Sequence, residues 1–276
     1  MGLLDGKVAV VTGAGGGLGR AFARALGAAG AAVLVNDLGT HLEGGGHDQS
    51  RADAVVREIV EVGGRAVADD SDVGSFAAGR AVVERALAEF GRVDAVVHSA
   101  GITRSAPLPD LTEEILDAHL AVHLHGAIGV VQGAFGCMAY GGSVVLITSG
   151  AGLDPHWPDT AAYACAKAAV YALMRVAAVE GAARSIRVNA IAPFALTRMS
   201  ASMLAGSPAA AKLDPDRVAP AIVYLASDLS RDVTGRVIRV EGRRIGEYRL
   251  AKAPLTDGDW TPETIAATLP AMLSDD

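Results

Sequence analysis

Short apolar runs rich in Val and Ile recur along the chain, and longer stretches with the spacing of amphipathic helices separate them. The runs predict seven strands, at residues 7–12, 32–37, 65–69, 93–98, 142–149, 186–192 and 237–240. The stretches between them predict helices at residues 17–30, 51–62, 75–90, 113–137, 163–183 and 215–227. Runs that are apolar on both faces of the pleat are typical of a parallel sheet that helices cover on both sides. The pattern therefore predicts an α/β protein with a doubly wound sheet of about seven parallel strands.

The same pattern predicts a single domain over residues 1–250 and a C-terminal tail at 251–276, which has a short helix in the segment WTPETIAATL. A length of 276 residues, of which 51% are hydrophobic, is enough to bury a large core. Two long loops, 38–50 and 194–213, interrupt the alternation of strands and helices. Long loops in compact domains are often functional, and we expect substrate specificity to depend on residues 103–111, 153–159 and 194–213.

Charge and composition argue against several classes of protein. The net charge of −7 argues against a nucleic-acid surface, which needs clustered Lys and Arg. The two cysteines, Cys137 and Cys165, form no CxxC pair, which indicates a reducing compartment, no disulfide framework and no metal site. The sequence shows no secretory leader pattern and no uncharged apolar run of about 18 residues that could span a membrane. We expect a cytoplasmic protein that binds a small molecule.

The first predicted strand runs into a glycine-rich turn with the spacing TGxxxGxG. The turn contains Thr12, Gly13, Gly17, Leu18 and Gly19 and leads into an amphipathic helix. A pyrophosphate group must approach the backbone closely there, and the helix behind it offers free N–H groups and the positive end of its dipole. The motif predicts a dinucleotide site, although a glycine-rich turn alone is also found in ordinary loops.

The second predicted strand ends at Asp37, 24 residues after Gly13. At about this spacing an acidic side chain meets the adenosine ribose hydroxyls of a dinucleotide. A carboxylate repels a 2′-phosphate, and none of residues 14–16 is basic, so the sequence favours NAD over NADP. Arg20 is an objection to this choice, and a solvated acid at a strand end is the alternative interpretation of Asp37.

Ser149 ends a predicted strand, and Tyr163 and Lys167 lie four residues apart at the start of a helix. Four residues make about one helical turn, so the two side chains share a face. A neighbouring ammonium favours the phenolate form of a tyrosine, whose ordinary pKa of about 10 makes it a poor base. Tyr163 can then exchange a proton with an alcohol while Ser149 hydrogen-bonds the developing oxygen. The alternative is an ordinary surface pair on a helix.

Together these motifs resemble the short-chain dehydrogenase/reductase family, and the resemblance runs from residue 7 to about residue 242. It implies a Rossmann-type fold and hydride transfer between a secondary alcohol and its ketone. It also implies that three segments contact the cofactor. One lies beside the adenine, one is the turn after the fourth predicted strand, and one surrounds the nicotinamide. The residues implied are Asp72, Val73, Ser99, Ala100, Gly101, Tyr163, Lys167, Pro193 and Thr197.

Two positions depart from the usual pattern of that family. His123 stands where an asparagine is usual as a fourth catalytic residue, which in the family acts mainly through its main-chain carbonyl and a water. Phe194 stands where a glycine usually follows Pro193, and the segment to Thr197 is one residue shorter than common. The proton relay need not be lost with His123, whereas the contact of Thr197 with the nicotinamide stays open.

Within the family, the chain is most similar to the (3R)-hydroxyacyl-CoA dehydrogenase unit of the multifunctional β-oxidation enzyme. The segments VNDLG, VHL around His123, IAP and RM after residue 190, and IGEYR carry this resemblance. It implies an acyl-CoA substrate, NAD and a dimer, and the family as a whole implies a homodimer or homotetramer.

Three alternatives remain open at this stage. A carbonyl reductase or dehydrogenase for another substrate, such as a steroid or a cyclic ketone, would carry the same motifs. A non-catalytic NAD-binding regulator would keep the fold, but the intact Ser149, Tyr163 and Lys167 argue against it. The spacing of His119, His123 and His125 could in principle hold zinc, but packing at a helix face is the better interpretation, so no metal is expected. Trp157 precedes the predicted catalytic helix, either in a pocket wall or in an ordinary loop.

Overall fold

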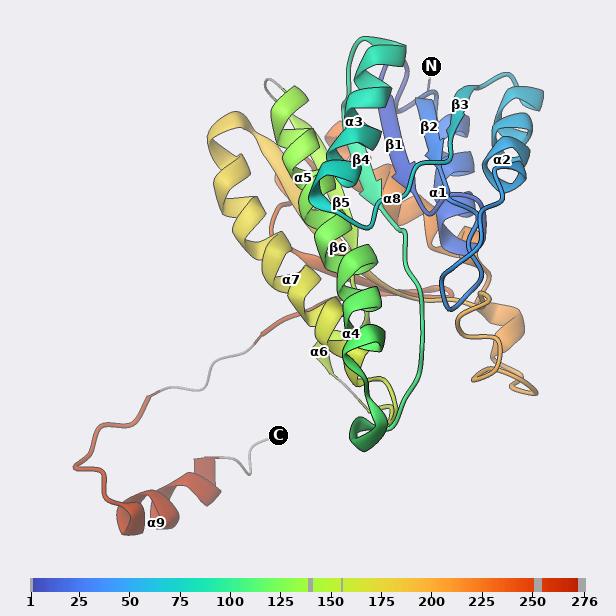
Figure 1. The fold of residues 1–276 in the computed structure, drawn as a ribbon. Helices are drawn as coiled ribbons and strands as arrows, with labels where there is room; N and C mark the ends of the chain where they lie inside the picture. The colour runs from blue at the N-terminus through green and yellow to red at the C-terminus, as the bar shows by residue number, and fades with distance from the viewer. Residues whose placement is uncertain (1, 139–140, 155, 251–254, 273–276) are drawn as a thin grey trace.

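The computed structural model describes residues 2–138, 141–154, 156–250 and 255–272. One sheet contains eight strands in the order β3-β2-β1-β4-β5-β6-β7-β8 (Figure 1). The first seven run parallel: β1 Val8–Thr12, β2 Ala32–Asn36, β3 Arg65–Asp69, β4 Ala95–His98, β5 Gly142–Ile147, β6 Ile186–Phe194 and β7 Val237–Glu241. The predicted doubly wound parallel sheet is confirmed.

The sequence-based prediction missed the eighth strand, β8 (Arg244–Tyr248), which runs antiparallel to β7 at the edge of the sheet. The chain reverses after Glu241 in a tight turn, where Gly242 adopts a φ of +57° that favours glycine. An edge strand is not buried on both faces, and the RIGEY segment of β8 lacks the continuous apolar run that marks the central strands.

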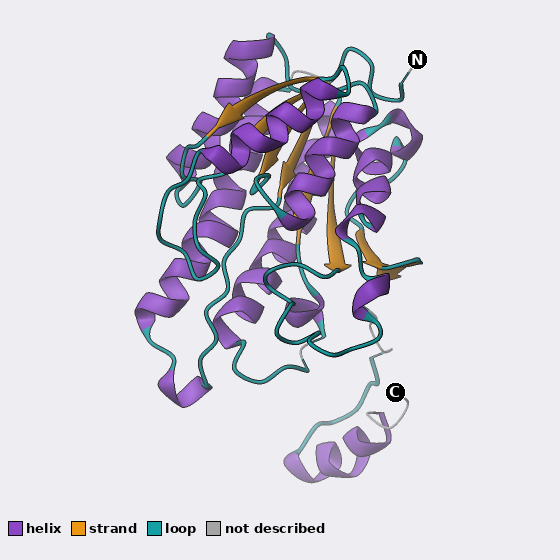
Figure 2. Cartoon of the chain, turned by 90° about the vertical axis from the view of Figure 1, so that its right-hand side faces the viewer, coloured by secondary structure: helices purple, strands orange, loops and turns teal. Residues whose placement is uncertain are grey.

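Helices cover both faces of the sheet, each over its own hydrophobic core (Figures 1 and 2). Alternate residues of β1 supply both cores, since Ala9 and Val11 belong to one and Val10 to the other. One core lies under α1 Gly17–Ala28, α2 Ser50–Glu61 and α8 Ala219–Ala226, and the other lies under α3 Phe76–Phe90, α5 Gly126–Cys137 and α7 Ala161–Gly181.

The long helix predicted over residues 113–137 is present but not uniform. It consists of α4 (Glu113–His119), a π-helical turn over Leu120–His125 and then α5. Such turns often mark functional positions within helices. The helix predicted at 215–227 is instead a 3₁₀ turn at Pro215–Arg217 followed by α8. The sequence-based prediction also missed the short helix α6 (Gly150–Leu153) after β5.

Two helical stretches, Glu113–Cys137 and Ala161–Arg184, are long and apolar enough by length and composition alone to cross a membrane. Both lie within the body of the protein, where α5 packs against α3 and α7 packs against β6. Their apolar composition is therefore the composition expected of helices that bury a sheet.

The predicted tail contains one helix, α9 (Pro262–Met272), which lies apart from the body of the protein in both views (Figures 1 and 2). Thr261 and Thr264 exchange side-chain hydrogen bonds with each other's N–H groups at the start of this helix. Residues 251–254 and 273–276 of the predicted tail lie outside the described residues. The domain boundary at residue 250 stays a prediction.

Candidate active site

The glycine-rich turn joins β1 to α1, and its glycines permit approaches that a side chain would block. Gly13 has a φ of +66°, and a Cβ on it would lie 2.6 Å from the Cα of Ala100. A Cβ on Gly19 would overlap the carbonyl oxygen of Gly13. The N-cap residue of α1 is Gly16, which has no side chain to cap the free N–H groups of the first turn. This backbone can therefore receive an anionic group.

β2 ends at Asn36, one residue earlier than predicted. Asp37 follows the strand directly. Its Oδ2 accepts a hydrogen bond from the N–H of Gly15 at 2.6 Å, and its Oδ1 accepts one from Gly39 at 2.7 Å. A Cβ on Gly15 would lie 2.7 Å from the Cγ of Asp37, so this contact needs glycine. A carboxylate oxygen can accept more than one hydrogen bond, and Asp37 remains able to bind hydroxyl groups in the cavity.

The chain after β4 lies beside the glycine-rich turn and is fixed by Thr12. The N–H groups of Ser99 and Ala100 donate to Oγ1 of Thr12 at 3.2 and 3.3 Å. The Nδ1 of His98 lies 2.9 Å from the same hydroxyl, and its Nε2 lies 3.2 Å from the carbonyl oxygen of Val122. A carbonyl can only accept, so Nε2 carries the hydrogen. Burial, with the charge of Lys167, lowers the pKa of His98 to about 4 and keeps the ring neutral.

Ser149, Tyr163 and Lys167 come together at the carboxyl end of β5. Ser149 caps α6, where its Oγ accepts a hydrogen bond from the N–H of Ala151 at 3.2 Å. Tyr163 and Lys167 lie one turn apart on α7, and the Nζ of Lys167 is 5.6 Å from the centre of the Tyr163 ring. Nζ also donates to the carbonyl oxygen of Ile147 at 2.7 Å, which fixes the ammonium beside the tyrosine.

Burial sets the charge states of these two groups. It raises the pKa of Tyr163, and a hydrogen bond with Ser149 acts in the opposite direction. Burial lowers the pKa of Lys167 to about 7, so that this side chain can be charged or neutral near physiological pH. A strongly shifted pKa in a cavity is typical of a functional site.

His123 lies in the π-helical turn and contacts both the tyrosine and the chain after β4. Its Nε2 lies 2.9 Å from the carbonyl oxygen of Ile102, and its ring centre lies 5.4 Å from that of Tyr163 at 85°. A Cβ on Gly101 would lie 2.5 Å from the Cε1 of His123, so glycine makes room for this ring. The Nδ1 of His123 is buried and has no hydrogen-bond partner among the described residues.

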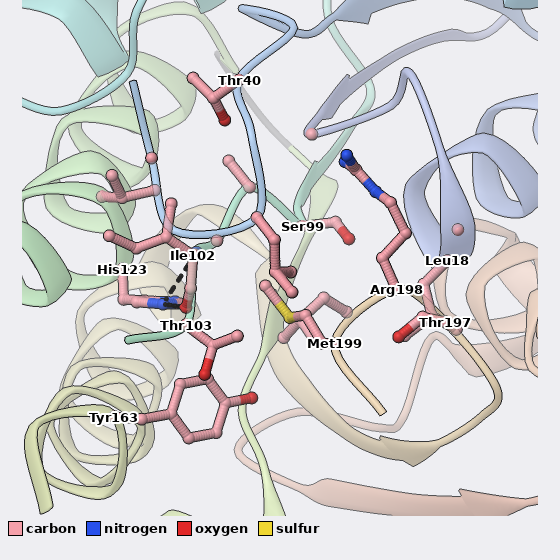
Figure 3. Close-up of a pocket in the computed structure, with 18 of the residues that line it drawn as sticks. Leu18, Thr40, Ser99, Ile102, Thr103, His123, Tyr163, Thr197, Arg198 and Met199 are labelled. Atoms are coloured by element: carbon pink, nitrogen blue, oxygen red, sulfur yellow. Dashed lines mark hydrogen bonds between the residues drawn. The ribbon is translucent and has the colours of Figure 1, made fainter. Parts of the chain in front are cut away.

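All of the site residues that the sequence predicted line one cavity of about 710 Å³. Its walls also include residues that sequence reasoning did not single out. Figure 3 shows several of them: Ile102 and Thr103 lie beside His123 and Tyr163, whereas Thr40 and Arg198 lie farther across the cavity, with Met199 between. The long loops at 38–50 and 194–213 contribute Thr40, Arg198 and Met199, and the last two are also the RM pair of the subgroup resemblance.

A family model described as Enoyl-(Acyl carrier protein) reductase matches residues 13–242, which is most of the chain. The chain belongs to the short-chain dehydrogenase/reductase family. It is therefore an oxidoreductase of the family that the glycine-rich turn and the Tyr163–Lys167 spacing resemble.

Individual members of the family match over most of this chain. A Mycobacterium tuberculosis protein described as a short-chain type dehydrogenase/reductase is 42% identical over 82% of this chain and 79% of its own length. The peroxisomal multifunctional enzyme type 2 of Mus musculus is 39% identical over 89% of this chain, which spans about a third (33%) of that longer protein. A crystal structure of a short chain dehydrogenase from Mycobacterium avium is 38% identical, with a TM-score of 0.86 over 99% of this chain and 96% of that chain.

The two departures from the usual family pattern leave the cavity intact. Phe194 ends β6, where it pairs with Glu241 of β7, and it lines the cavity next to Pro193. Thr197 also lines the cavity, and its Cγ2 would lie 3.4 Å from a Cβ on Gly17. The shortened segment therefore still brings Thr197 beside the glycine-rich turn.

Proposed function

We propose that this protein is an NAD-dependent dehydrogenase that interconverts a 3-hydroxyacyl thioester, such as an acyl-CoA, and its 3-oxo form. The observation that carries the proposal is that Ser149, Tyr163 and Lys167 share one cavity with the glycine-rich turn and Asp37. The proposal includes a cytoplasmic location, which rests on the sequence composition, and a homodimer or homotetramer, which the family resemblance implies.

The residues present fit a dinucleotide cofactor. Gly13 and Gly19 leave the backbone of the turn free of side chains, and the first turn of α1 lacks a side-chain cap. Asp37 places a carboxylate at the end of β2, where it favours the ribose hydroxyls of NAD and disfavours a 2′-phosphate. When bound, the nicotinamide supplies the acceptor or donor of the hydride.

The protein itself supplies the proton chemistry. In oxidation, Tyr163 removes the proton of the substrate hydroxyl, and in reduction it returns a proton to the same oxygen. The Lys167 ammonium stabilises the phenolate, which burial alone disfavours. Ser149 donates a hydrogen bond to the reacting oxygen. His123 is held by Ile102, and its buried Nδ1 is available to accept a hydrogen bond in the proton relay.

The relatives and the cavity wall both support an acyl substrate. One relative is a peroxisomal hydratase-dehydrogenase-epimerase of Saccharomyces cerevisiae, 37% identical, of which this chain spans 27%. Another, from Thermotoga maritima, is a 3-oxoacyl-[acyl-carrier-protein] reductase that is 34% identical over 98% of its length. Trp157, Met199 and Met203 give the cavity apolar, adaptable walls that suit an alkyl chain.

The test is an assay of nicotinamide absorbance with (3R)-hydroxyacyl-CoA esters of several chain lengths and with simple secondary and cyclic alcohols, using NAD and NADP separately. Turnover of the CoA esters with NAD is expected. Turnover of simple or steroid alcohols alone would reassign the substrate, and NAD binding without any turnover would favour a regulator.

Asp37→Asn tests the cofactor half of the proposal. The amide oxygen still accepts from the Gly15 N–H, the bond from the Gly39 N–H is lost, and the charge that repels a 2′-phosphate is removed. We expect the preference for NAD over NADP, measured as the ratio of kcat/KM values, to fall by about tenfold, which corresponds to ~1.4 kcal/mol. Asp232→Asn is the control, since Asp232 is an exposed acid that pairs with Arg231. An unchanged ratio in Asp37→Asn would contradict the role of Asp37.

A further inference from the structure

Residues 40–45, here called the strap, belong to the long loop between β2 and α2, and all of them except Glu43 line the cavity. The strap turns back on itself, since the N–H of His41 donates to the carbonyl oxygen of Gly45 at 2.9 Å. Gly44 and Gly45 have φ values of +88° and +76°, which allow this turn. Figure 3 shows the loop with Thr40 crossing the cavity opposite Tyr163.

Two hydrogen bonds fasten the strap to residues 102–104, the chain segment that follows the turn under the cofactor site. The N–H of Thr103 donates to the carbonyl oxygen of Leu42 at 3.1 Å. The Nε of Arg104 donates to the carbonyl oxygen of Glu43. Arg104 also lies 3.7 Å from the exposed carboxylate of Glu114. The position of the strap therefore depends on where Arg104 lies.

Two buried histidines hold residues 102–104 from the other side. His123 bonds to the carbonyl oxygen of Ile102, and the N–H of Arg104 donates to the Nε2 of His119 at 3.2 Å. The Nδ1 of His119 lies 2.8 Å from the carbonyl oxygen of Ile115. The main-chain groups fix the tautomer of His119, because the carbonyl can only accept and the N–H can only donate. Nδ1 carries the hydrogen and Nε2 accepts, so the ring must stay neutral to hold Arg104.

The same two rings lie against the catalytic tyrosine. His119 and His123 stack with their centres 5.9 Å apart, and the ring of His119 lies 6.3 Å from that of Tyr163. His119 is fully buried and is not among the residues that line the cavity. It therefore joins the strap to the tyrosine without reaching the space that a cofactor would fill.

We propose that the strap covers the bound cofactor and that His119 is a positioning residue that sets the strap through the N–H of Arg104. This inference rests on the proposed function, since it assumes that NAD binds in this cavity. It assigns cofactor contacts to residues 40–45 and makes cofactor affinity depend on a side chain that does not line the cavity.

The test compares His119→Leu with His119→Gln by calorimetric titration with NAD and by hydrogen exchange of the strap amides. Leucine fills the space but leaves the N–H of Arg104 without an acceptor, whereas a glutamine oxygen reaches about as far as Nε2 and can accept from it. We expect His119→Leu to weaken NAD binding by about tenfold and to speed exchange in the strap, and His119→Gln to restore both within about twofold. Equal NAD affinity in the wild type and His119→Leu would overturn the proposal, as would equal losses in both variants.

Arg104→Met provides a second test that leaves the buried histidines in place. It removes the guanidinium that bonds to Glu43 and keeps most of the side-chain stem. We expect NAD affinity to fall by about fivefold, with no change in Arg85→Met, which alters an exposed arginine paired with Glu89 on α3. Unchanged NAD affinity in Arg104→Met would show that the strap does not contribute to cofactor binding. The proposed function would be unaffected by that result. Failure of the wild-type protein to bind either NAD or NADP would overturn both.

Discussion

His98, His119 and His123 lie buried beside the cavity, and burial lowers the pKa of each. For His98 the pKa falls from an ordinary value of 6.5 to about 4. In the unfolded chain the same ring takes up a proton near pH 6.5. The unfolded state therefore binds more protons than the folded state between these two values, and the stability of the fold decreases as pH falls from about 6.5 to about 4.

His98→Asn should remove part of this pH dependence, because an amide can hydrogen-bond near the position of Nδ1 beside Thr12 but does not titrate. From pH 6.5 to pH 4.5 we expect the free energy of unfolding to fall by about 2 kcal/mol more in the wild type than in His98→Asn. Urea unfolding of both proteins at the two pH values measures the difference. Equal losses in the two proteins would mean that His98 is not held neutral by the fold.

At the level of elements, the packing of α6 against α7 positions Ser149, to which we assign a catalytic role. A Cβ on Gly152 of α6 would lie 2.5 Å from the backbone nitrogen of Ala168 and 2.7 Å from the carbonyl carbon of Lys167. The two helices can approach this closely only because Gly152 has no side chain. Ser149 caps α6, so the position of α6 fixes the distance from Ser149 to Tyr163.

Gly152→Ala should therefore impair catalysis more than cofactor binding. The added methyl group would force α6 and Ser149 away from α7, and small misplacements of catalytic groups are costly. We expect kcat to fall by about tenfold while the Kd for NAD stays within about twofold. Gly136→Ala is the control, since a Cβ on this helical glycine would meet open space. A kcat equal to that of the wild type would show that the close packing of α6 does not position Ser149.

The elements differed in how well the sequence marked them. The central parallel strands β1, β2, β4, β5 and β6 are mostly buried runs rich in Val, Ile and Ala, and the hydrophobic pattern predicted them along with the more exposed β3 and β7. β8 is an edge strand, and the π-helical turn at Leu120–His125 lies inside an otherwise helical pattern, so neither has a distinct hydrophobic period. α6 has only four residues, GAGL, too few for any period to show. These features depend on packing between elements rather than on local preference.

At the level of the whole molecule, many of the site residues could be predicted because they follow the carboxyl ends of parallel strands, whereas Tyr163 and Lys167 were predicted from their spacing on a helix. In a doubly wound sheet these ends meet at one edge, so residues far apart in sequence, such as Gly13, Asp37, Ser149 and Thr197, meet in one cavity. The sequence could not show the hydrogen bonds of His119 and His123 to residues 102–104. Those bonds depend on how the helical segment that carries His119 and His123 packs against the loop after β4.

In the proposed reaction Tyr163 exchanges the substrate proton in this cavity. Tyr163→Phe removes only the phenolic hydroxyl, and Tyr171→Phe makes the same change elsewhere on α7. With the best substrate found, and with NAD binding measured by calorimetry, we expect kcat of Tyr163→Phe to fall by about 10²–10⁴-fold while NAD affinity and the activity of Tyr171→Phe stay close to wild type. Turnover by Tyr163→Phe within about threefold of wild type would contradict this role of Tyr163, because acid–base catalysis would then have to come from another group.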